Sequence, residues 1–312
     1  MSLAIEVSGL RKHYRGAPVP ALEGLDLAVE AGEIFGIVGP NGAGKTTLFG
    51  CLLGHLHFEG SVKVGGWDPR DPEGRRQFGY VPERLTFETW MKAKAFVGFH
   101  YDLSGQPKAG RDEAVSAALQ KVGIDPIDWD KQVVKFSRGN LQRLGLAQAI
   151  VGQPQFLFLD EPTSGMDPLG VLRFKEIVRE LARGGCTVIF NSHQLAQVQD
   201  LCQRVLLLEK GHRLSIETLK HGSFNPSGER MPFGVRWLGP KDAADLVEEV
   251  ADKLKLDWKL RGKDAAILQV KDEAQGSQVL TALVKAGVKV ATAGLQEKDL
   301  EQAFDQAYGR KS

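Results

Sequence analysis

Cysteine is scarce in this chain. Its 312 residues include three cysteines, Cys51, Cys186 and Cys202, which stand far apart along the sequence. Such spacing forms neither the dense disulfide framework of a small secreted domain nor a cluster of metal ligands. We therefore expect a protein without disulfides that works in a reducing cytosol.

Long apolar runs are also missing. The longest, Phe156 to Leu159 and Val205 to Leu208, have the length of a strand and fall far short of the ~20 residues that a membrane helix needs. The N-terminal residues, Met1 to Val7, show no basic segment followed by a long apolar stretch, so we expect no secretory signal. If a membrane is involved, another chain must supply the span.

The chain carries almost no net charge. Its 40 Lys and Arg residues and 39 Asp and Glu residues give a formal charge of +1. A nucleic-acid-binding surface usually shows a strongly basic domain or a Lys/Arg stripe, so we expect no nucleic-acid partner. A content of 42% hydrophobic and 25% charged residues is ordinary for a globular protein, and the length allows two cores.

The most informative segment reads GPNGAGKTT. It follows the apolar run Ile34 to Val38 and leads directly into a helical pattern, which places a glycine-rich loop between a strand and a helix. In this setting the backbone N–H groups surround the β-phosphate of a nucleotide, and the helix N-terminus adds its positive dipole end. The predicted binding residues are Gly39, Pro40, Asn41, Gly42, Ala43, Gly44, Lys45, Thr46 and Thr47.

Two side chains of this loop have specific tasks. Lys45 reaches the β- and γ-phosphates and is a candidate catalytic residue, and the Thr46 hydroxyl is a candidate Mg²⁺ ligand. A tight glycine turn with only a structural role would not explain a lysine followed by a hydroxyl residue at this position. The loop therefore predicts a site for a nucleotide with Mg²⁺.

An acid pair, Asp160 and Glu161, follows the apolar run Phe156 to Leu159. The end of a buried strand lies at the carboxyl edge of an open α/β sheet, where ligands bind. Asp160 is the candidate metal ligand, like the acid of a Walker B strand, and Glu161 is the candidate general base for an attacking water. Asp-Glu-Pro alone would also fit two solvated acids in a turn, but its place after large apolar residues favours the chemical role.

The apolar patterns predict a first domain over residues 1–221. Alternating residues indicate an antiparallel layer, and continuous apolar runs indicate strands buried on both faces of a parallel sheet. A helix between two such runs forms a βαβ unit. The predicted elements are strands at 3–7, 25–29, 34–38, 156–159 and 187–190, a helix at 169–181, and a helical part over about 85–152.

A second domain is predicted over residues 233–312, after a linker at 222–232 that is rich in Gly, Ser, Pro and Asn. Its pattern has the order strand, helix, strand, strand, helix, strand, which is typical of a small ferredoxin-like α+β domain. No catalytic constellation occurs in it. The expected elements span 233–237, 243–254, 258–261, 265–270, 275–286 and 288–292, with a final helix at 297–308.

Over residues 3–219 the motifs resemble those of the nucleotide-binding subunit of ATP-binding cassette (ABC) transporters. Residues 136–140 read FSRGN and lie where that family carries its LSGGQ signature; Ser137 and Gly139 match, and the other three residues depart. A helix start with a hydroxyl and a glycine offers a second phosphate site, although in isolation it would be only an N-cap. The resemblance implies that two subunits pair head to tail, so that Ser137 and Gly139 of one copy complete the ATP site of the other.

Three weaker elements follow the order of the family. The resemblance implies that Asp167, in the D-loop position, aligns the two sites, that His193 senses the γ-phosphate and orients the water, and that Tyr14 stacks on adenine. Each residue type also has an ordinary structural role. Asp167 would fit a helix-capping turn, and Tyr14 would fit packing near a strand end.

Glu83 stands where the family usually has the Q-loop glutamine. A carboxylate binds metal more strongly and repels phosphate, so Glu83 is a candidate metal ligand whose catalytic role is open. The surrounding GYVPE resembles the exporter-like (ABC-2 type) branch, whose permeases are separate chains. In the family the next segment, Phe87 to Tyr101, meets the permease, and a core helix is the competing interpretation.

The resemblance implies an α/β fold, a P-loop NTPase cassette of the ABC type with a mixed sheet, an antiparallel β layer and a helical subdomain. The α+β domain would be an accessory domain whose role no motif fixes. The implied function is an ATPase that uses ATP and Mg²⁺, pairs as an ATP-sandwich homodimer, and drives solute export through a separate integral-membrane permease. It would be cytoplasmic and peripheral on the cytoplasmic face of the cell membrane.

Two other functions share such a phosphate loop. A soluble ABC-type ATPase that acts on ribosomes or nucleic acid usually carries two cassettes or a long coiled coil, whereas this sequence has one phosphate loop, no sustained heptads and no basic patch. A P-loop kinase or GTPase would leave the FSRGN segment unexplained, and the Asn-Lys-x-Asp motif that reads guanine is missing. The solute itself is not encoded in this chain, because its pathway would lie in the permease.

Overall fold

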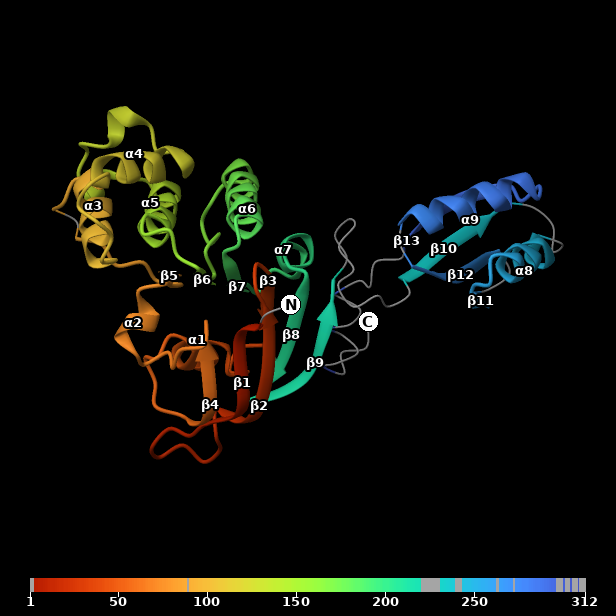
Figure 1. Cartoon of the computed structure of the whole chain (residues 1–312), viewed down its shortest axis with the longest axis horizontal. Coiled ribbons are helices and arrows are strands. Elements are labelled where there is room, and N and C mark those ends of the chain that lie inside the picture. Colours follow the sequence, from red (N-terminus) through yellow and green to blue (C-terminus); the bar gives the residue numbers. More distant parts are fainter. Residues whose placement is uncertain are drawn as a thin grey trace. The chain divides into compact units, whose positions relative to one another are not determined.

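The structure is a computed structural model that describes residues 3–88, 90–219, 231–238, 243–261, 264–271 and 273–295, together with 300, 304 and 308. Contacts divide the chain into two compact units, Met1–Thr218 with Phe304–Ser312, and Leu219–Ala303 (Figure 1). Of the linker expected at 222–232 only the last two residues are described, and the final helix expected at 297–308 lies mostly outside the described residues.

A six-stranded sheet forms the centre of the first unit, in the order β5-β6-β7-β3-β8-β9. Every pairing is parallel except the one between β8 and β9. All residues of β3, β6 and β7 are buried, which explains why their sequences are continuous apolar runs. The strands are β3 (Ile34–Val38), β5 (Phe78–Val81), β6 (Phe156–Asp160), β7 (Thr187–Asn191), β8 (Arg204–Glu209) and β9 (His212–Thr218).

The predicted antiparallel layer is a three-stranded sheet in the order β2-β1-β4. It consists of β1 (Leu3–Lys12), β2 (Leu22–Glu30) and β4 (Glu59–Val64). Burial alternates along β2, as expected for a strand with one face on the core. That face shares one apolar core with the larger sheet, in which Leu10 and Leu25 lie with Ile37, Phe49 and Phe158.

Helices cover the larger sheet and form the predicted helical part (Figure 1). The helix α6 (Pro168–Arg183) joins β6 to β7 and completes the predicted βαβ unit. The helical part contains α3 (Ala93–Leu103), α4 (Arg111–Lys121) and α5 (Arg138–Ile150), with short 3-10 turns at Pro126–Asp128 and Val133–Lys135. The remaining helices are α1 (Lys45–Leu52), α2 (Pro72–Arg75) and α7 (Leu195–Leu201).

The second unit has the ferredoxin-like arrangement predicted for it. Its four antiparallel strands lie in the order β11-β12-β10-β13. Two helices connect them, and Trp237 and Leu268 are fully buried in its own core. Its elements are β10 (Met231–Trp237), α8 (Ala243–Lys253), β11 (Trp258–Leu260), β12 (Ala265–Val270), α9 (Glu273–Lys285) and β13 (Val290–Leu295). In the described parts of both units, no helix combines the length and the apolar character needed to cross a membrane.

An ion pair ties the two sheets of the first unit together. Arg204, at the start of β8, donates to both carboxylate oxygens of Glu33 at 2.7 Å, and to the carbonyl oxygen of Ala28 in β2 at 3.0 Å. The Glu33 side chain is 8% exposed and that of Arg204 is 22% exposed. Two parallel hydrogen bonds fix this geometry, and the largely buried carboxylate depends on them.

We expect Arg204→Met to destabilise the first unit by about 3 kcal/mol, because it leaves the Glu33 carboxylate buried without its partner. The control is the double variant Arg204→Met/Glu33→Gln, which removes both charges and should regain part of the loss. Urea unfolding followed by circular dichroism measures both. Equal losses in the single and the double variant would contradict this account of the pair.

Candidate nucleotide-binding site

The predicted phosphate loop lies between β3 and α1, at the carboxyl edge of the six-stranded sheet. The backbone turns through Gly42 (φ 80°) and Gly44 (φ 107°), in the left-handed region that favours glycine. Gly39 leaves no room for a side chain, since a Cβ there would lie 2.2 Å from the carbonyl oxygen of Leu208. The loop therefore packs directly against the end of β8.

Lys45 is the first residue of α1 and is half-buried. Its Nζ donates to the carbonyl oxygens of Gly39 at 2.7 Å and Pro40 at 3.0 Å, within its own loop. Burial lowers the pKa of this ammonium group. The carboxylate of Glu161 acts in the opposite direction and raises the pKa, as do, more weakly, those of Asp160 and Glu83. A partly desolvated cation beside the open N–H groups of a helix start is suited to receive phosphate oxygens.

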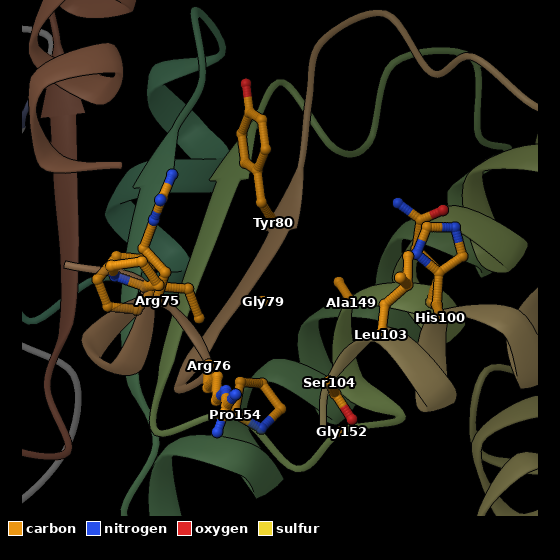
Figure 2. A pocket seen from close by; sticks show the side chains of 13 residues that line it. Arg75, Arg76, Gly79, Tyr80, His100, Leu103, Ser104, Ala149, Gly152 and Pro154 are labelled. Carbon is orange, nitrogen blue, oxygen red and sulfur yellow. The ribbon is translucent and has the colours of Figure 1, made fainter. Parts of the chain in front are cut away.

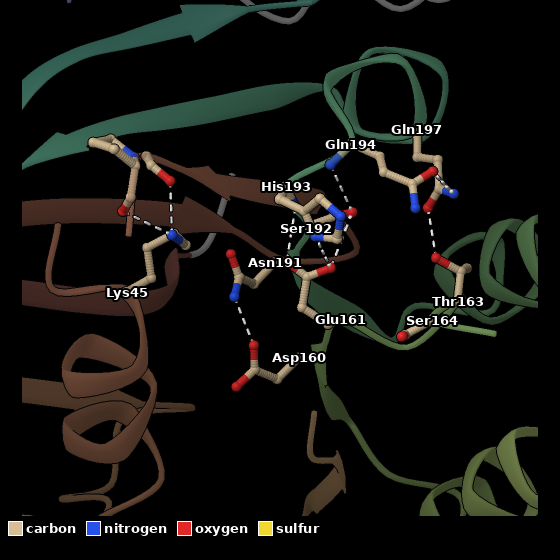
Figure 3. A network of polar contacts seen from close by, with 12 residues as sticks. Lys45, Asp160, Glu161, Thr163, Ser164, Asn191, Ser192, His193, Gln194 and Gln197 are labelled. Atoms are coloured by element: carbon tan, nitrogen blue, oxygen red, sulfur yellow. Dashed lines mark hydrogen bonds and ion pairs between the residues drawn. The ribbon is translucent and has the colours of Figure 1, made fainter. Parts of the chain in front are cut away.

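Asp160 is the last residue of β6 and is only 3% exposed. Its Oδ1 accepts a 2.6 Å hydrogen bond from Nδ2 of Asn191, its register partner on β7 (Figure 3). Burial raises the pKa of this carboxyl group, and the bond from Asn191 acts against that rise. The same bond fixes the orientation of the carboxylate at the edge of the sheet.

Glu161 is held by the residues that follow β7. Its Oε1 accepts from the backbone N–H of His193 at 2.8 Å, and its Oε2 lies 2.8 Å from Nδ1 of that imidazole (Figure 3). The Glu161 side chain is 14% exposed, whereas that of His193 is 67% exposed. Glu161 also has a φ of 49°, a conformation that costs a non-glycine residue energy and that concentrates at functional sites.

A pocket of about 530 Å³ collects most of these groups. It brings together the phosphate loop, the candidate base, the candidate γ-phosphate sensor and the carboxylate of Glu83. The described residues that line it do not include Ser137, Gly139 or Asp167. The lining residues are Ala21, Asn41, Gly42, Ala43, Gly44, Lys45, Thr46, Thr47, Glu83, Glu161, Ser164, Asn191 and His193.

The candidate metal ligands offer hydroxyl and carboxylate oxygens. Thr46 and Glu83 line the pocket, and Asp160 lies next to it, bonded to the lining residue Asn191. Within the described ranges, no group of three or more His, Cys, Asp or Glu side chains is arranged to hold a metal ion. Mg²⁺ commonly binds through one or two carboxylates together with substrate phosphates, so this donor set fits an ion that arrives with a nucleotide.

The signature segment starts α5 outside this lining. The Ser137 hydroxyl accepts from the N–H of Asn140 at 3.3 Å and so caps the helix, and the position of a Cβ on Gly139 is open space. Arg138, one of the departures from the family pattern, donates from Nη2 to Oγ of Ser164 at 3.1 Å. Because Ser164 lines the pocket, Arg138 connects the signature segment to it.

Asp167 caps a helix, and Tyr14 contacts the phosphate loop. The Oδ1 of Asp167 accepts from the N–H of Gly170 at 2.9 Å and caps α6. Tyr14 is 41% exposed, and its hydroxyl lies 3.3 Å from Oγ1 of Thr47 in the phosphate loop. The tyrosine ring therefore borders the loop and keeps an exposed face.

Sequence reasoning missed Ala21, Ser164 and Asn191, which also line the pocket. Asn191 had a signal, since it is a polar residue at the end of a buried apolar strand beside the strand of Asp160. The sequence carried no such signal for Ser164 or Ala21. Their positions depend on the paths of two loops that no local pattern specifies.

The comparisons with known proteins agree with this geometry. A family model described as ABC transporter matches residues 22–164. An uncharacterised ABC transporter ATP-binding protein of Synechocystis sp. is 38% identical over 231 residues, which is 72% of this chain and 65% of that protein. YxlF of Bacillus subtilis, also an uncharacterised ABC transporter ATP-binding protein, is 30% identical over 302 residues, which is 96% of this chain and 98% of that protein.

A solved structure shows the same fold. It is the dimeric post-hydrolysis state of the ATP-binding cassette MJ0796 bound to ADP and Pi, with a TM-score of 0.64 and 20% identity over 70% of this chain and 99% of that one. The predicted cassette fold is confirmed. The chain spans 65% of the length of the Synechocystis relative and nearly all of YxlF. This protein belongs to the family of ABC transporter ATP-binding proteins.

Proposed function

We propose that this chain is the ATP-hydrolysing subunit of an ABC transporter, and that it couples ATP-driven closure of a homodimer to solute export through a separate membrane permease. One observation carries this proposal. The pocket collects Lys45, Glu161 and His193 from one copy, while Ser137 is not among the described residues that line it. A phosphate-binding helix start that stands apart from the pocket supports a second copy as the source of Ser137 and Gly139.

Pairing has support from a relative of the same fold. The MJ0796 cassette was solved as a dimer bound to ADP and Pi. In a pair of this chain that shared its sites, each copy would present its phosphate loop to the signature segment of the other. Asp167, the N-cap residue of α6, would align the two sites.

Catalysis at this site would depend on positioning and charge. Lys45 and the loop N–H groups would hold the phosphates, and Thr46, Asp160 and Glu83 would hold Mg²⁺, which neutralises charge on the transferred phosphoryl group. Glu161 would accept the proton of the attacking water. No covalent step on the protein is needed.

The contact between His193 and Glu161 fits the role of a sensor. The imidazole donates to the carboxylate only when Nδ1 carries a proton, so a hydrogen bond here requires a proton on Nδ1. Because the ring is 67% exposed, it has space to turn towards a ligand in the pocket. A γ-phosphate that attracts the imidazole would release one oxygen of Glu161 for the water.

We place the permease contact on the helical part. Between residues 90 and 103 of this part, three large apolar side chains are exposed, Trp90 (70%), Phe99 (46%) and Leu103 (64%). One of them, Leu103, lines a second pocket of about 510 Å³ (Figure 2). One face of α3 is a core face, as the competing interpretation expects, since Phe96, Val97 and Tyr101 are buried. Exposed apolar side chains on its other residues are typical of a protein interface, which supports a docking role as well.

The strand β5 connects the two pockets. Tyr80, in β5, lines the second pocket, and Glu83, just after β5, lines the nucleotide pocket (Figure 2). Burial, together with the nearby carboxylates of Asp160 and Glu83, raises the pKa of Tyr80 to about 12. A movement of this short segment would therefore change both pockets. This supports coupling between ATP binding in one pocket and permease contact at the other.

We expect Glu161→Gln to keep ATP binding and to lower hydrolysis by about 10²–10⁴-fold, because the amide cannot accept the proton of water. ATP-bound dimer should accumulate. Phosphate release and light scattering after size exclusion measure the two effects. The matched control is Glu180→Gln on the outer part of α6, which should behave like wild type, and wild-type turnover of Glu161→Gln would overturn the assignment of the base.

A shared site predicts complementation between two inactive variants. Lys45→Ala and Ser137→Arg should each be inactive, but their mixed dimer has one intact site, so an equal mixture should show about a quarter of wild-type ATPase activity if subunits exchange freely. The control mixes wild type with Lys45→Ala/Ser137→Arg, whose mixed dimer has no intact site. A mixture as inactive as its components would contradict the sharing of Ser137.

If Tyr14 stacks on adenine, removing its ring should lower the affinity only for ligands that have a base. Tyr14→Ala should weaken binding of a fluorescent ATP analogue by about 1–3 kcal/mol, while Tyr14→Phe should stay close to wild type. Tripolyphosphate, which has no base, should bind all three proteins equally in a competition assay. An equal loss for both ligands in Tyr14→Ala would show that the ring only packs against the loop.

A further inference from the structure

Asn191 is a buried polar side chain at the end of a mostly apolar strand. It ends β7 and is 3% exposed, after Val188, Ile189 and Phe190, which are also buried. Its register partners are Asp160 on β6 and Ile37 on β3. A buried amide lowers stability unless its polar atoms find partners, so its presence here calls for a physical reason.

Only one of the two polar atoms of that side-chain amide has a hydrogen-bond partner in the structure. Its Nδ2 donates to Oδ1 of Asp160 at 2.6 Å, and its backbone carbonyl oxygen accepts from the N–H of Glu161 at 2.9 Å. The NH₂ group must face Asp160, because an ionised carboxylate only accepts. Its Oδ1 then points away from Asp160, and it is a buried atom without a hydrogen-bond partner (Figure 3).

The place of this oxygen distinguishes it from similar atoms. Among the described residues, the other buried side-chain atoms without a partner are Oε1 of Gln142 and Nε1 of Trp237. Neither residue lines the nucleotide pocket, whereas Asn191 does. A buried, unpaired acceptor on a residue that lines a ligand pocket can be satisfied by a donor that arrives with the ligand.

We propose that Asn191 is a positioning residue for the metal site, and that its Oδ1 accepts a hydrogen bond from a water molecule carried into the pocket with Mg²⁺ and ATP. The inference rests on the proposed function, because it requires a metal–nucleotide ligand. One amide would then act at two points. Its NH₂ group orients Asp160, and its oxygen holds the hydrated ion. Residues that orient metal ligands in this way commonly contribute 10–100-fold to metal affinity.

The test compares nucleotide binding with and without the metal, so that it does not depend on hydrolysis. The ratio of the Kd of a fluorescent, non-hydrolysable ATP analogue in EDTA to its Kd in Mg²⁺ reports the contribution of the ion. Asn191→Leu, similar in size but without polar atoms, should lower this ratio about 10-fold or more and leave the Kd in EDTA unchanged. Unchanged binding in EDTA also shows that the variant is folded.

Two further variants keep the test decisive. Asn191→Ser retains a hydroxyl on a shorter side chain, so the ratio should fall by less than in Asn191→Leu, and this variant serves if the leucine variant does not fold. Gln197→Leu removes another buried amide, one that bonds Thr163 outside the pocket lining, and should leave the ratio unchanged.

The outcomes separate this inference from the proposed function. A wild-type ratio in Asn191→Leu, or in Asn191→Ser where the leucine variant does not fold, would overturn the inference and leave the proposed function standing. Equal losses of affinity in EDTA and in Mg²⁺ would also overturn it, since they would show a purely structural role. A wild-type chain that binds no nucleotide would remove the proposed function and with it this inference.

Discussion

The parallel register of β3, β7 and β6 is the constraint on which the site depends. Asn191 pairs with Ile37 on one side and with Asp160 on the other, so the carboxyl ends of three strands meet at one edge of the sheet. These strands are buried on both faces, and a slip of one residue would move apolar side chains to the edge and polar ones into the core. Burial therefore fixes the register, and the register fixes which polar groups meet.

Under the proposed function the edge of the sheet supplies only part of the ATP site. Its loop, acids and imidazole converge on one pocket, while the capped start of α5 presents Ser137 elsewhere. The two parts are nevertheless linked within one copy, because Arg138 bonds Ser164 and Gln142 donates to the carbonyl oxygen of the same residue at 3.1 Å. A partner that engages the signature segment would thus act on the pocket wall of the copy that supplies it.

The sequence predicts the fold well where one local pattern determines one element. Continuous apolar runs identified β3, β6 and β7, and the order of elements identified the ferredoxin-like unit. It could not predict the contacts of Ser164, whose position depends on Arg138 and Gln142 in a distant helix. Asn191 was missed for a different reason, since its unpaired oxygen becomes visible only when burial and partners are known atom by atom.

The charge balance of the pocket explains why the substitution at Glu83 is compatible with the proposed chemistry. Glu83, Asp160 and Glu161 all act on the single ammonium group of Lys45, so the acids outnumber the cation. A bare triphosphate would add further negative charge, and each acid would disfavour it. If Glu83 and Asp160 held a divalent ion, as proposed, that ion would be the largest local charge in the site, and the carboxylates would then favour the bound metal–nucleotide. With glutamine in place of Glu83 the same position would sense the ligand by hydrogen bonds alone, whereas under the proposed function a carboxylate there would make the end of β5 respond to the metal ion itself.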